Sequence, residues 1–353
     1  MKKKKKKNSE SAGSAVVRFI DRVFGLFLAA GIVLGIFGLA LEWILVKGPS
    51  PALRDSFVMT MIWTRRFDFI PQIFLTEEET QTIFDEHWSI NNTEATDTSL
   101  ITVKANQQTD TEDTGPRADD YGYIDEDGDG IIIVDVKKKG FVGKMIIILD
   151  PSRVFVGKPE VYGGYGLTLE ELAKRYNALG GVNGGGFYDP EGGGTGGYPD
   201  GLTVVGGEIF HEGNSTRTFC GLDSDNILHV GDYDSEEAVE DRIRDGVSFG
   251  PALIINGKGE YGNHMETGIN PRTAVGQRAD GAILMLAIDG RQVHSIGASF
   301  GDARDVMLDF GAVNACNMDG GSSTAMYYNG QYINSPSSAS GTSRALPDAF
   351  LFR

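Results

Sequence analysis

At 353 residues the chain is long enough to bury at least one substantial core, and its formal net charge is −17. The charge is uneven, because the part beyond Lys47 holds 46 acidic but only 23 basic residues. Since nucleic-acid binding requires a basic face, this composition argues against a nucleic-acid partner, although a local cluster of Arg or Lys is enough to hold a phosphate-containing substrate.

An N-terminal apolar segment preceded by basic residues predicts a membrane anchor. Lysines at residues 2–7, Arg18 and Arg22 precede an apolar run over residues 23–46. As a helix rising about 1.5 Å per residue, this run can cross a bilayer core of roughly 30 Å. The basic flank predicts a single-pass protein of the cell membrane, with a cytoplasmic N-terminus and an extracellular C-terminal domain. A cleavable signal peptide is the alternative, but its apolar core would be shorter, and no Ala-x-Ala-like cleavage site is evident.

Between the anchor and the folded body, the sequence predicts a stalk and a polar linker. Residues 49–71 mix apolar and basic side chains, as in a short helix near the membrane, and Thr76 with Glu79 forms a capping-box pattern that begins another helix. Residues 89–120 are rich in Asn, Thr, Asp, Gln and Glu, which favours a linker. The predicted order is cytoplasmic tail, transmembrane anchor, juxtamembrane helical stalk, polar linker and folded domain, at residues 1–22, 23–46, 47–88, 89–120 and 121–353.

The body is predicted to consist of strands with a few helices. Apolar runs of strand length lie at residues 131–136, 145–149, 201–205, 227–230, 252–255 and 282–288. Helical patterns lie at residues 168–179, where a capping box begins the helix and Gly180 follows it, at about 300–310, and more weakly at 235–245. This mixture predicts an α+β fold with a twisted, largely antiparallel mixed sheet system and a few packing helices, preceded by the transmembrane helix.

An acidic segment before the first of these strands resembles half of a calcium loop. Asp125, Asp127, Asp129 and Gly130 match the beginning of an EF-hand loop, but Val136 stands where a bidentate Glu is needed, and no helical pattern flanks it. We therefore predict an acidic turn that leads into a strand.

The chain has two cysteines, Cys220 and Cys316. Outside the cell a disulfide between them is permitted, and two buried thiols that act as small apolar side chains are equally consistent with the sequence. Neither cysteine has the spacing of a metal ligand.

Four polar turns follow strand-like segments and carry the residues best suited to chemistry. Asn183 precedes Gly184 and two further glycines, which expose backbone N–H groups and one amide that can bind a sugar hydroxyl or a phosphate oxygen. Arg272 offers a planar fork suited to a phosphate or a carboxylate. The other two turns are Asp289-Gly290-Arg291 and Asp319-Gly320-Gly321-Ser322.

Together these turns supply groups that hold an anion and transfer protons at a glycosidic or phosphate ester oxygen. Each turn alone has a common structural explanation, which is a salt bridge for a single Arg and a tight turn for Asp-Gly. A serine hydrolase is disfavoured, because the chain lacks Gly-x-Ser-x-Gly and Ser322 has no obvious His partner.

The order of these motifs resembles the phosphodiester glycosidase family. The shared segments are VNGGGF at 182–187, SFGPAL at 248–253, NPRTAVG at 270–276, DGR at 289–291 and NMDGGSS at 317–323. The resemblance implies hydrolysis of a sugar-1-phosphodiester. Its implied catalytic carboxylates are Asp319 first and Asp289 second, with acid, base and nucleophile roles left open. The implied substrate-binding residues are Asn183, Gly184, Arg272, Arg291, Gly320, Gly321, Ser322 and Arg344.

We therefore expect an extracellular, membrane-anchored hydrolase whose substrate is a sugar-phosphate polymer or glycoconjugate. The polylysine start and the acidic ectodomain resemble those of a bacterial surface protein, which favours a cell-wall polymer or exopolysaccharide. The alternative is a non-catalytic module that binds or assembles cell-wall polysaccharide. No cofactor is assigned, and a divalent cation held by the carboxylates is a further alternative without assigned ligands.

Overall fold

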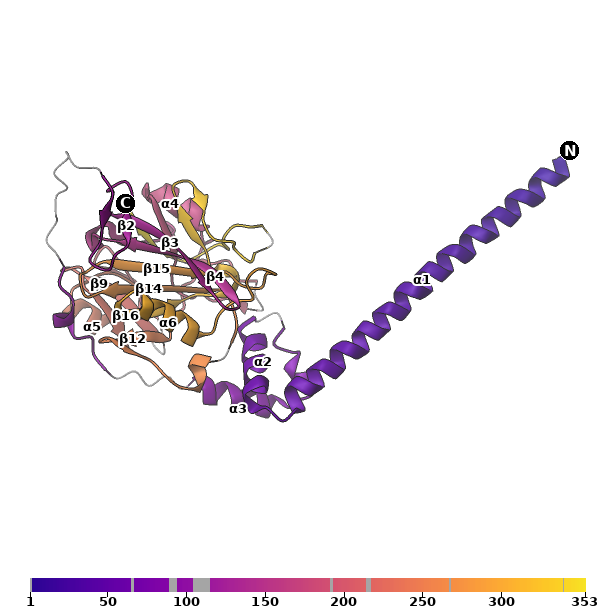
Figure 1. The fold of residues 1–353 in the computed structure, drawn as a ribbon, viewed down its shortest axis with the longest axis horizontal. Coiled ribbons are helices and arrows are strands. Elements are labelled where there is room, and N and C mark those ends of the chain that lie inside the picture. Colours follow the sequence, from indigo (N-terminus) through magenta and orange to yellow (C-terminus); the bar gives the residue numbers. More distant parts are fainter. Residues whose placement is uncertain are drawn as a thin grey trace.

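Three antiparallel sheets form the body of the protein, and a long N-terminal helix joins this body through two shorter helices (Figure 1). The computed structural model describes the chain except for residues 1, 65–66, 89–93, 104–114, 191–192, 214–216, 267 and 339. Neighbouring strands of the three sheets run antiparallel in the described residues. The predicted α+β fold with a largely antiparallel sheet system is therefore confirmed.

The largest sheet has seven strands and contributes three of the turns of interest. In spatial order its strands are β13 (Lys258–Gly259), β12 (Ala252–Ile255), β16 (Ala312–Met318), β14 (Arg272–Arg278), β15 (Ile283–Ile288), β4 (Phe141–Ile148) and β3 (Ile131–Lys138). One five-stranded sheet runs β10 (Leu228–Gly231), β9 (Thr218–Asp223), β11 (Ile243–Phe249), β7 (Thr203–Val205) and β8 (Glu208–His211). The other runs β18 (Gln331–Tyr332), β17 (Met326–Tyr328), β6 (Gly180–Asn183), β19 (Ala349–Phe352) and β5 (Val154–Gly157). A two-stranded ribbon, β1 (Arg117–Ala118) and β2 (Ile124–Asp125), precedes them.

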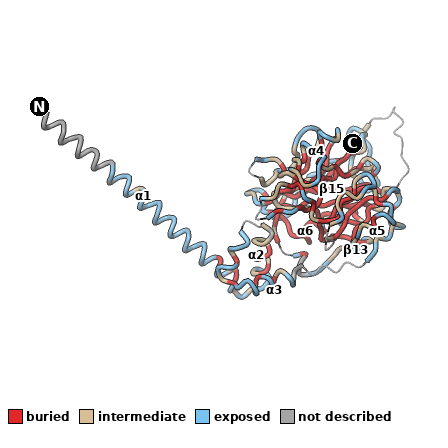
Figure 2. Tube along the Cα trace, turned by 180° about the vertical axis from the view of Figure 1, so that it is seen from behind, coloured by how far each residue is buried: buried red, intermediate tan, exposed pale blue. Residues whose placement is uncertain are grey.

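Alternate residues of the central strands fill two different cores, so these strands are apolar on both faces. In β15 the two sets are Ile283, Met285 and Ala287 on one face and Leu284, Leu286 and Ile288 on the other. The first set packs with residues of both five-stranded sheets, and the second packs with α6 (Phe300–Asp309). Figure 2 shows this buried centre in red, in contrast to the pale blue, exposed part of α1 (Lys2–Lys47) that lies beyond its grey beginning.

Helix starts follow the predicted caps, whereas two helices end earlier than predicted. α4 (Leu169–Tyr176) begins with the Thr168–Glu171 capping box but ends at Asn177, which takes a left-handed φ of 51°. Gly180, the predicted stop, instead begins β6. The close packing of the strands requires glycine at this position, because a Cβ there would lie 2.5 Å from the carbonyl oxygen of Tyr327. α5 (Ser235–Glu240) is also shorter than its predicted segment, since the last three residues of that segment, 243–245, belong to β11.

The N-terminal helices form a small core of their own beside the body. Residues Phe19–Lys47 of α1 include an 18-residue window with a mean hydropathy of 2.5, and they are long and apolar enough to cross a membrane, a property that signal sequences share. The end of α1 packs on α2 (Pro51–Thr64) and α3 (Glu77–Trp88) through Val46, Val58, Met59, Leu75 and Ile83. The segment predicted as a stalk is thus mainly helical.

The described part of the predicted linker lies along the body. The Thr96 hydroxyl accepts a hydrogen bond from the Val230 N–H at 2.9 Å, and the Thr102 N–H donates to a backbone carbonyl of the body at 2.8 Å. Asp119 forms a buried ion pair with Arg278 at 2.8 Å. Each of these contacts joins residues that are far apart in sequence, so the polar composition of the linker could not predict them. Residues 89–93 and 104–114 of the linker lie outside the described residues.

The acidic turn and the two cysteines contribute to the body as structural elements. The Asp125 carboxylate accepts hydrogen bonds from the Gly128 and Gly130 N–H groups at 3.0 and 2.9 Å, and β3 follows directly, as predicted for an acidic turn. Cys220 and Cys316 are free, buried thiols in the core between the sheets. Burial raises the pKa of the Cys220 thiol.

Candidate active site

Three neighbouring strands of the seven-stranded sheet meet at one edge, where their turns carry predicted site residues. Arg272, the first residue of β14, pairs with Ile288, the last residue of β15. The next residue of β14 pairs with Met318, the last residue of β16. The turns that contain Arg291 and Asp319 therefore begin beside the start of β14.

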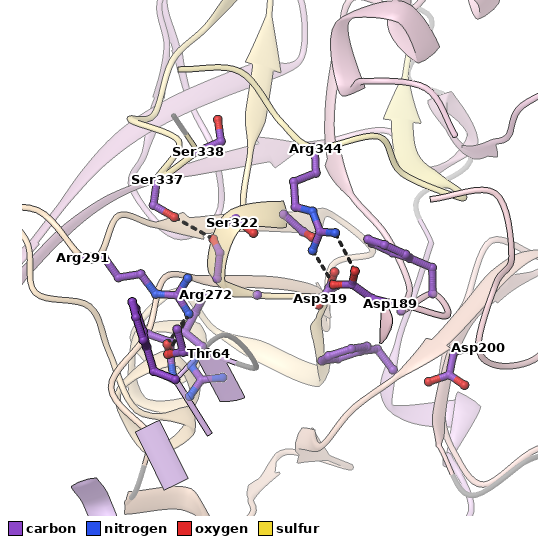
Figure 3. A pocket seen from close by; sticks show the side chains of 18 residues that line it. Thr64, Asp189, Asp200, Arg272, Arg291, Asp319, Ser322, Ser337, Ser338 and Arg344 are labelled. Carbon is purple, nitrogen blue, oxygen red and sulfur yellow. Dashed lines mark hydrogen bonds and ion pairs between the residues drawn. The ribbon is translucent and has the colours of Figure 1, made fainter. Parts of the chain in front are cut away.

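A cavity of about 470 Å³ lies at this edge (Figure 3). Seven of the ten residues predicted for the site line it, namely Arg272, Arg291, Asp319, Gly320, Gly321, Ser322 and Arg344. The other lining residues are Thr64, Phe67, Gly186, Phe187, Asp189, Asp200, Phe249, Asn270, Ser323, Ser337 and Ser338.

Two arginines form one end of the cavity without an acidic partner. The buried Arg272 guanidinium donates to two backbone carbonyl groups and lies over the Phe300 ring, 3.7 Å from its centroid. Arg291 Nη2 donates to Asn270 Oδ1 at 2.8 Å. Across the described part of the chain, neither guanidinium forms an ion pair with a carboxylate within 4.0 Å. Two cations that lack a direct ion-pair partner among the described residues make this end suited to an anion.

Burial shapes the charge of both arginines. Burial, and then the charge of Arg291, lower the pKa of Arg272 to about 9, so Arg272 stays cationic at neutral pH. Burial also lowers the pKa of Arg291, whereas the Asp319 carboxylate raises it. A bound phosphate would relieve the repulsion between the two guanidinium groups and supply the acceptors that their N–H groups need.

The backbone beside Arg291 leaves room for its guanidinium because residue 321 is glycine. Arg291 itself has a left-handed φ of 59°, a strained conformation for a residue with a side chain. Gly321 has a φ of 62°, and a Cβ there would lie 3.1 Å from Arg291 Nη2. The Gly321 N–H donates to the Pro271 carbonyl oxygen at 3.0 Å, which holds the Asp319 turn against the start of β14.

Gly321→Ala should therefore weaken both the fold and the anion site. The left-handed backbone predicts a loss of about 1–2 kcal/mol in the free energy of unfolding, measured by urea denaturation. Displacement of the Arg291 guanidinium should also weaken the binding of inorganic phosphate, measured by calorimetry, by at least about five-fold. Gly330→Ala is the matched control, because Gly330 has a φ of 90° but a Cβ there would meet nothing within 4 Å. Equal phosphate affinity in the two variants would contradict the steric argument.

The opposite end of the cavity combines ion pairs with aromatic rings. Asp189 accepts two hydrogen bonds from Arg344, at 2.6 and 2.8 Å, and the Arg344 guanidinium lies over the Phe187 ring at 4.9 Å. A second such group consists of Asp200, Arg217 and Phe249. Rigid carboxylates beside ring faces can accept hydrogen bonds from hydroxyls and pack on the flat side of a ligand, which suits a sugar.

Asp319 lies between these two ends. Its charge raises the pKa of Arg291 against the effect of burial. It also raises the pKa of Arg344, in addition to the larger effect of the hydrogen bonds that Arg344 donates to Asp189. Figure 3 shows Arg272 and Arg291 on one side of this residue and Arg344 with Asp189 on the other. A carboxylate in this position can act at the bond between a bound sugar and a bound anion.

Asn183 and Gly184 lie behind the cavity and do not line it. Asn183 Nδ2 donates to the Asp319 carbonyl oxygen at 2.7 Å, while Oδ1 accepts from the Thr273 hydroxyl at 2.7 Å and from the Ala325 N–H at 3.1 Å. The Gly184 carbonyl accepts a hydrogen bond from the Asp319 N–H at 3.0 Å. Because both polar atoms of the buried amide form hydrogen bonds within the protein, Asn183 positions the Asp319 turn in place of the sugar contact expected from sequence.

Asp289 also lies outside the cavity lining. Its buried carboxylate accepts hydrogen bonds from the Ser335 N–H at 2.8 Å and from Asn334 Nδ2 at 3.2 Å, and its carbonyl accepts one from Ser295 at 2.6 Å. The side chain therefore holds the loop that brings Ser337 to the cavity. The structure thus gives this carboxylate a supporting position, and the carboxylates that line the cavity with Asp319 are Asp189 and Asp200.

A further buried carboxyl, Asp348, lies behind the Asp319 turn. Asp348 Oδ1 accepts a hydrogen bond from the Gly185 N–H at 2.6 Å, whereas Oδ2 has no hydrogen-bond partner among the residues described. Burial raises the pKa of Asp348 to about 7; the Gly185 hydrogen bond opposes this shift, and the charge of Asp319 adds to it.

Asp348→Asn should stabilise the protein more at high pH than at low pH. An aspartate in the unfolded chain titrates near 3.9, so from there up to about 7 the folded state alone holds the proton and stability falls as pH rises. The amide keeps the acceptor for Gly185 and removes this titration. We expect the stability difference between the variant and the wild type, measured by urea unfolding, to grow by about 2–3 kcal/mol between pH 5 and pH 7.5. A stability difference between the variant and the wild type that does not vary with pH would contradict the raised pKa of Asp348.

Several lining residues were not predicted from the sequence. Asp189 and Phe187 had a weak signal, because Phe187 belongs to the VNGGGF motif and Asp189 follows it by two residues. Asp200 follows a glycine-rich stretch that has no periodic pattern. Thr64 and Phe67 come from the predicted stalk, and no local pattern relates that segment to the cavity.

Three carboxylates converge at a different place in the body. The side-chain oxygens of Asp125, Asp127 and Asp129 lie within 4.8 Å of one another. None of the three lines the cavity. Among the described residues, the cluster of carboxylates with a spacing that could hold a metal ion therefore lies in the acidic turn and outside the cavity lining.

Comparisons with known proteins point to one family. The sequence model of the phosphodiester glycosidase family matches residues 176–353, half of the chain, including the turns at Asn183, Arg272, Arg291 and Asp319. The uncharacterized SPbeta prophage-derived protein YomE of Bacillus subtilis is 28% identical over 193 residues, which cover 51% of this chain and 29% of that protein. N-acetylglucosamine-1-phosphodiester alpha-N-acetylglucosaminidase of Bos taurus is 30% identical over 192 residues, which cover 48% of this chain and 35% of that protein. The chain thus spans about a third of the length of these relatives.

Solved structures share the fold. The catalytic domain of zebrafish N-acetylglucosamine-1-phosphodiester alpha-N-acetylglucosaminidase, described as auto-inhibited by its pro-peptide, superposes with a TM-score of 0.54 at 22% identity, covering 63% of this chain and 82% of that one. A hypothetical protein from Synechocystis superposes with a TM-score of 0.50 at 16% identity, covering 65% of each chain. At these identities the likeness concerns the fold.

Proposed function

Because the chain belongs to the phosphodiester glycosidase family, we propose that it hydrolyses a sugar-1-phosphodiester at the bond between the anomeric carbon and the phosphate oxygen. Water adds to the anomeric carbon, the carbon–oxygen bond breaks, and the phosphate leaves as a monoester. The products are the free sugar and a phosphate monoester of the remaining group.

The observation that carries this proposal is a pair of arginines beside Asp319, neither of which forms a direct ion pair with a carboxylate among the described residues. Arg272 and Arg291 form a cationic end, and Asp319 lies next to it. A phosphodiester brings one negative charge to this end and leaves with more charge as a monoester, so the arginines stabilise the departing group more than the bound substrate. Since a phosphate monoester is a weak base, its departure depends on this charge stabilisation more than on a strong proton donor.

Asp319 is the proposed catalytic carboxylate. It acts on the sugar side of the phosphate, either by taking a proton from the attacking water or by attacking the anomeric carbon itself. Asp189 is a second carboxylate that lines the cavity, and the two hydrogen bonds that it accepts from Arg344 orient it. Ring faces such as Phe187 and hydroxyl acceptors such as Asp189 form the proposed sugar subsite.

The test is a panel of sugar-1-phosphodiesters that vary the sugar, incubated with the full-length protein in detergent micelles. Release of free sugar together with a phosphate monoester supports the proposal. Tight binding of the same compounds without product over a long incubation supports the alternative, a non-catalytic module that binds or assembles cell-wall polysaccharide. A parallel incubation with a chelator tests the divalent-cation alternative, which predicts loss of turnover and its recovery with one metal.

The setting of the reaction is proposed from the N-terminal half. We place residues 23–46 in the cell membrane with the N-terminus in the cytoplasm, and the domain from residue 121 onward outside, where a sugar-phosphate polymer or glycoconjugate of a bacterial surface is the proposed substrate. Fusion of a cysteine to the C-terminus and labelling of intact cells with an impermeant thiol reagent tests this topology. Labelling only after lysis would place the domain inside the cell.

A further inference from the structure

Two residues of the juxtamembrane segment line the catalytic cavity. Thr64 is the last residue of α2, and Phe67 follows it by three residues. All other lining residues come from the body, from Gly186 onward. The segment predicted as a stalk therefore supplies part of the wall of the site.

Hydroxyl groups on α2 tie this segment to the arginine end of the cavity. Thr64 Oγ1 donates to the Thr60 carbonyl at 2.7 Å and accepts from Arg291 Nη2 at 3.4 Å. One turn earlier, Thr60 Oγ1 accepts from the Ile269 N–H at 3.1 Å, next to Asn270, whose side chain is another acceptor for Arg291. Because residues i and i+4 lie on one face of a helix, both contacts come from the same side of α2.

Packing on the opposite side holds α2 in place. Val58 and Met59 are buried against Val46, Leu75 and Ile83, which belong to the end of α1, the turn before α3, and α3. The wall is therefore anchored by a core of its own, and it does not depend only on two hydrogen bonds to the body.

Phe67 presents an aromatic ring to the same end of the cavity. Its side chain remains 45% exposed although it lines the cavity, so its ring is available to a ligand. Three residues of chain reach at most about 10 Å, so Phe67 cannot lie far from Thr64 and Arg291. The sugar subsite, with Phe187 and Asp189, lies beyond Asp319 at the other end.

We propose that Thr64 and Phe67 form the subsite for the group esterified to the far side of the phosphate, and that Phe67 selects substrates in which this group has a flat or apolar face, such as a sugar ring. The proposal rests on the proposed hydrolysis. It follows from the order along the cavity, because a phosphodiester whose sugar lies beyond Asp319 and whose phosphate contacts Arg291 must place its second substituent beside the juxtamembrane segment. In this role Phe67 is a specificity-determining residue, and Thr64 is a positioning residue that orients Arg291.

Substrate selectivity tests the role of Phe67. The probes are the methyl and benzyl phosphodiesters of the sugar-1-phosphate that the full-length wild-type protein hydrolyses best. We expect Phe67→Ala to lower the ratio of kcat/KM for the benzyl ester to that for the methyl ester by about ten-fold. The control is Phe69→Ala, since Phe69 is 58% exposed, lies two residues away and does not line the cavity; the ratio should stay at the wild-type value.

Other outcomes overturn the proposal. An unchanged ratio in Phe67→Ala, with kcat/KM altered equally for both esters, would make the segment a structural support. A rise in kcat/KM for both esters would make it a cover that restricts access to the cavity.

A binding measurement separates failure of this proposal from failure of the proposed hydrolysis. If the wild type hydrolyses no member of the panel, calorimetry compares phenyl phosphate with inorganic phosphate as probes. The proposed subsite predicts that Phe67→Ala lowers the affinity for phenyl phosphate by about ten-fold relative to the affinity for inorganic phosphate. An equal effect on both affinities would overturn the proposal. For Thr64, we expect Thr64→Val to lower the affinity for both probes by about three-fold, and we expect Thr64→Ser to keep the wild-type affinity. Thr82→Val, which removes a similar hydroxyl on α3, is the control.

Discussion

Asp319→Asn should abolish hydrolysis while leaving the fold intact. The substitution keeps the shape of the side chain and the backbone hydrogen bonds to Asn183 and Gly184. It removes the carboxylate that we propose acts at the anomeric carbon. A base or nucleophile in this role contributes about 10²–10⁴-fold to the rate, so kcat/KM should fall by about 10³-fold. The measurement is release of free sugar from the best substrate of the panel.

The controls separate loss of chemistry from loss of structure. Thermal unfolding of Asp319→Asn should match the wild type within a few degrees. Asp225→Asn, which removes a carboxylate from an exposed pair with Arg242, should keep wild-type turnover. Wild-type turnover in a folded Asp319→Asn variant would remove Asp319 from the mechanism and direct attention to Asp189.

Arg291→Gln should produce the second largest loss. The variant keeps a polar side chain but removes a cation of the anion end, whose pKa the Asp319 charge raises and which forms no ion pair within 4.0 Å among the described residues. Removing one charge-assisted donor from a developing anion typically costs about 10²–10³-fold, so kcat/KM should fall by that factor. Binding of inorganic phosphate should weaken as well, which calorimetry measures.

Arg242→Gln is a matched control for this variant. Arg242 shares the left-handed backbone of Arg291, with a φ of 55°, but its side chain is exposed and pairs with Asp225. Any effect of placing Gln on a left-handed backbone therefore appears in both variants, and only the loss of the anion site is specific to Arg291. Equal activities of the two variants would contradict the assignment of Arg291 to the phosphate.

Much of the fold could be predicted from sequence because it rests on local patterns. β15 is a continuous apolar run because each of its faces belongs to a core, and such runs are visible without knowledge of their neighbours. The capping box of Thr168 and Glu171 likewise predicts the start of α4, because both residues belong to one short segment of the sequence. The end of α4 was not predictable, since the long-range pairing of Gly180 in β6 competes with the local signal for a helix stop.

The site was only partly predictable, because its contacts depend on register. Asp289 and Asp319 occupy similar Asp-Gly turns after apolar strands, yet one carboxylate turns inward to Ser335 and the other lines the cavity. No local pattern distinguishes them. Thr64 and Asp348 are less predictable still, since each reaches the site through contacts with residues far away in the sequence.

The contribution of Thr64 and Phe67 also bears on the choice of protein for experiments. A fragment limited to residues 121–353 contains the arginines and Asp319 but lacks one wall of the cavity. The full-length protein is therefore the appropriate material for measurements of substrate preference.

The position of bond cleavage tests the central claim most directly. In this experiment, the full-length protein is incubated with the best sugar-1-phosphodiester of the panel in water enriched in oxygen-18. Mass spectrometry then locates the isotope in the products. A glycosidase breaks the bond between carbon and oxygen, so we predict oxygen-18 at the anomeric hydroxyl of the sugar and none in the phosphate monoester. Oxygen-18 in the phosphate monoester would contradict this account and identify attack at phosphorus.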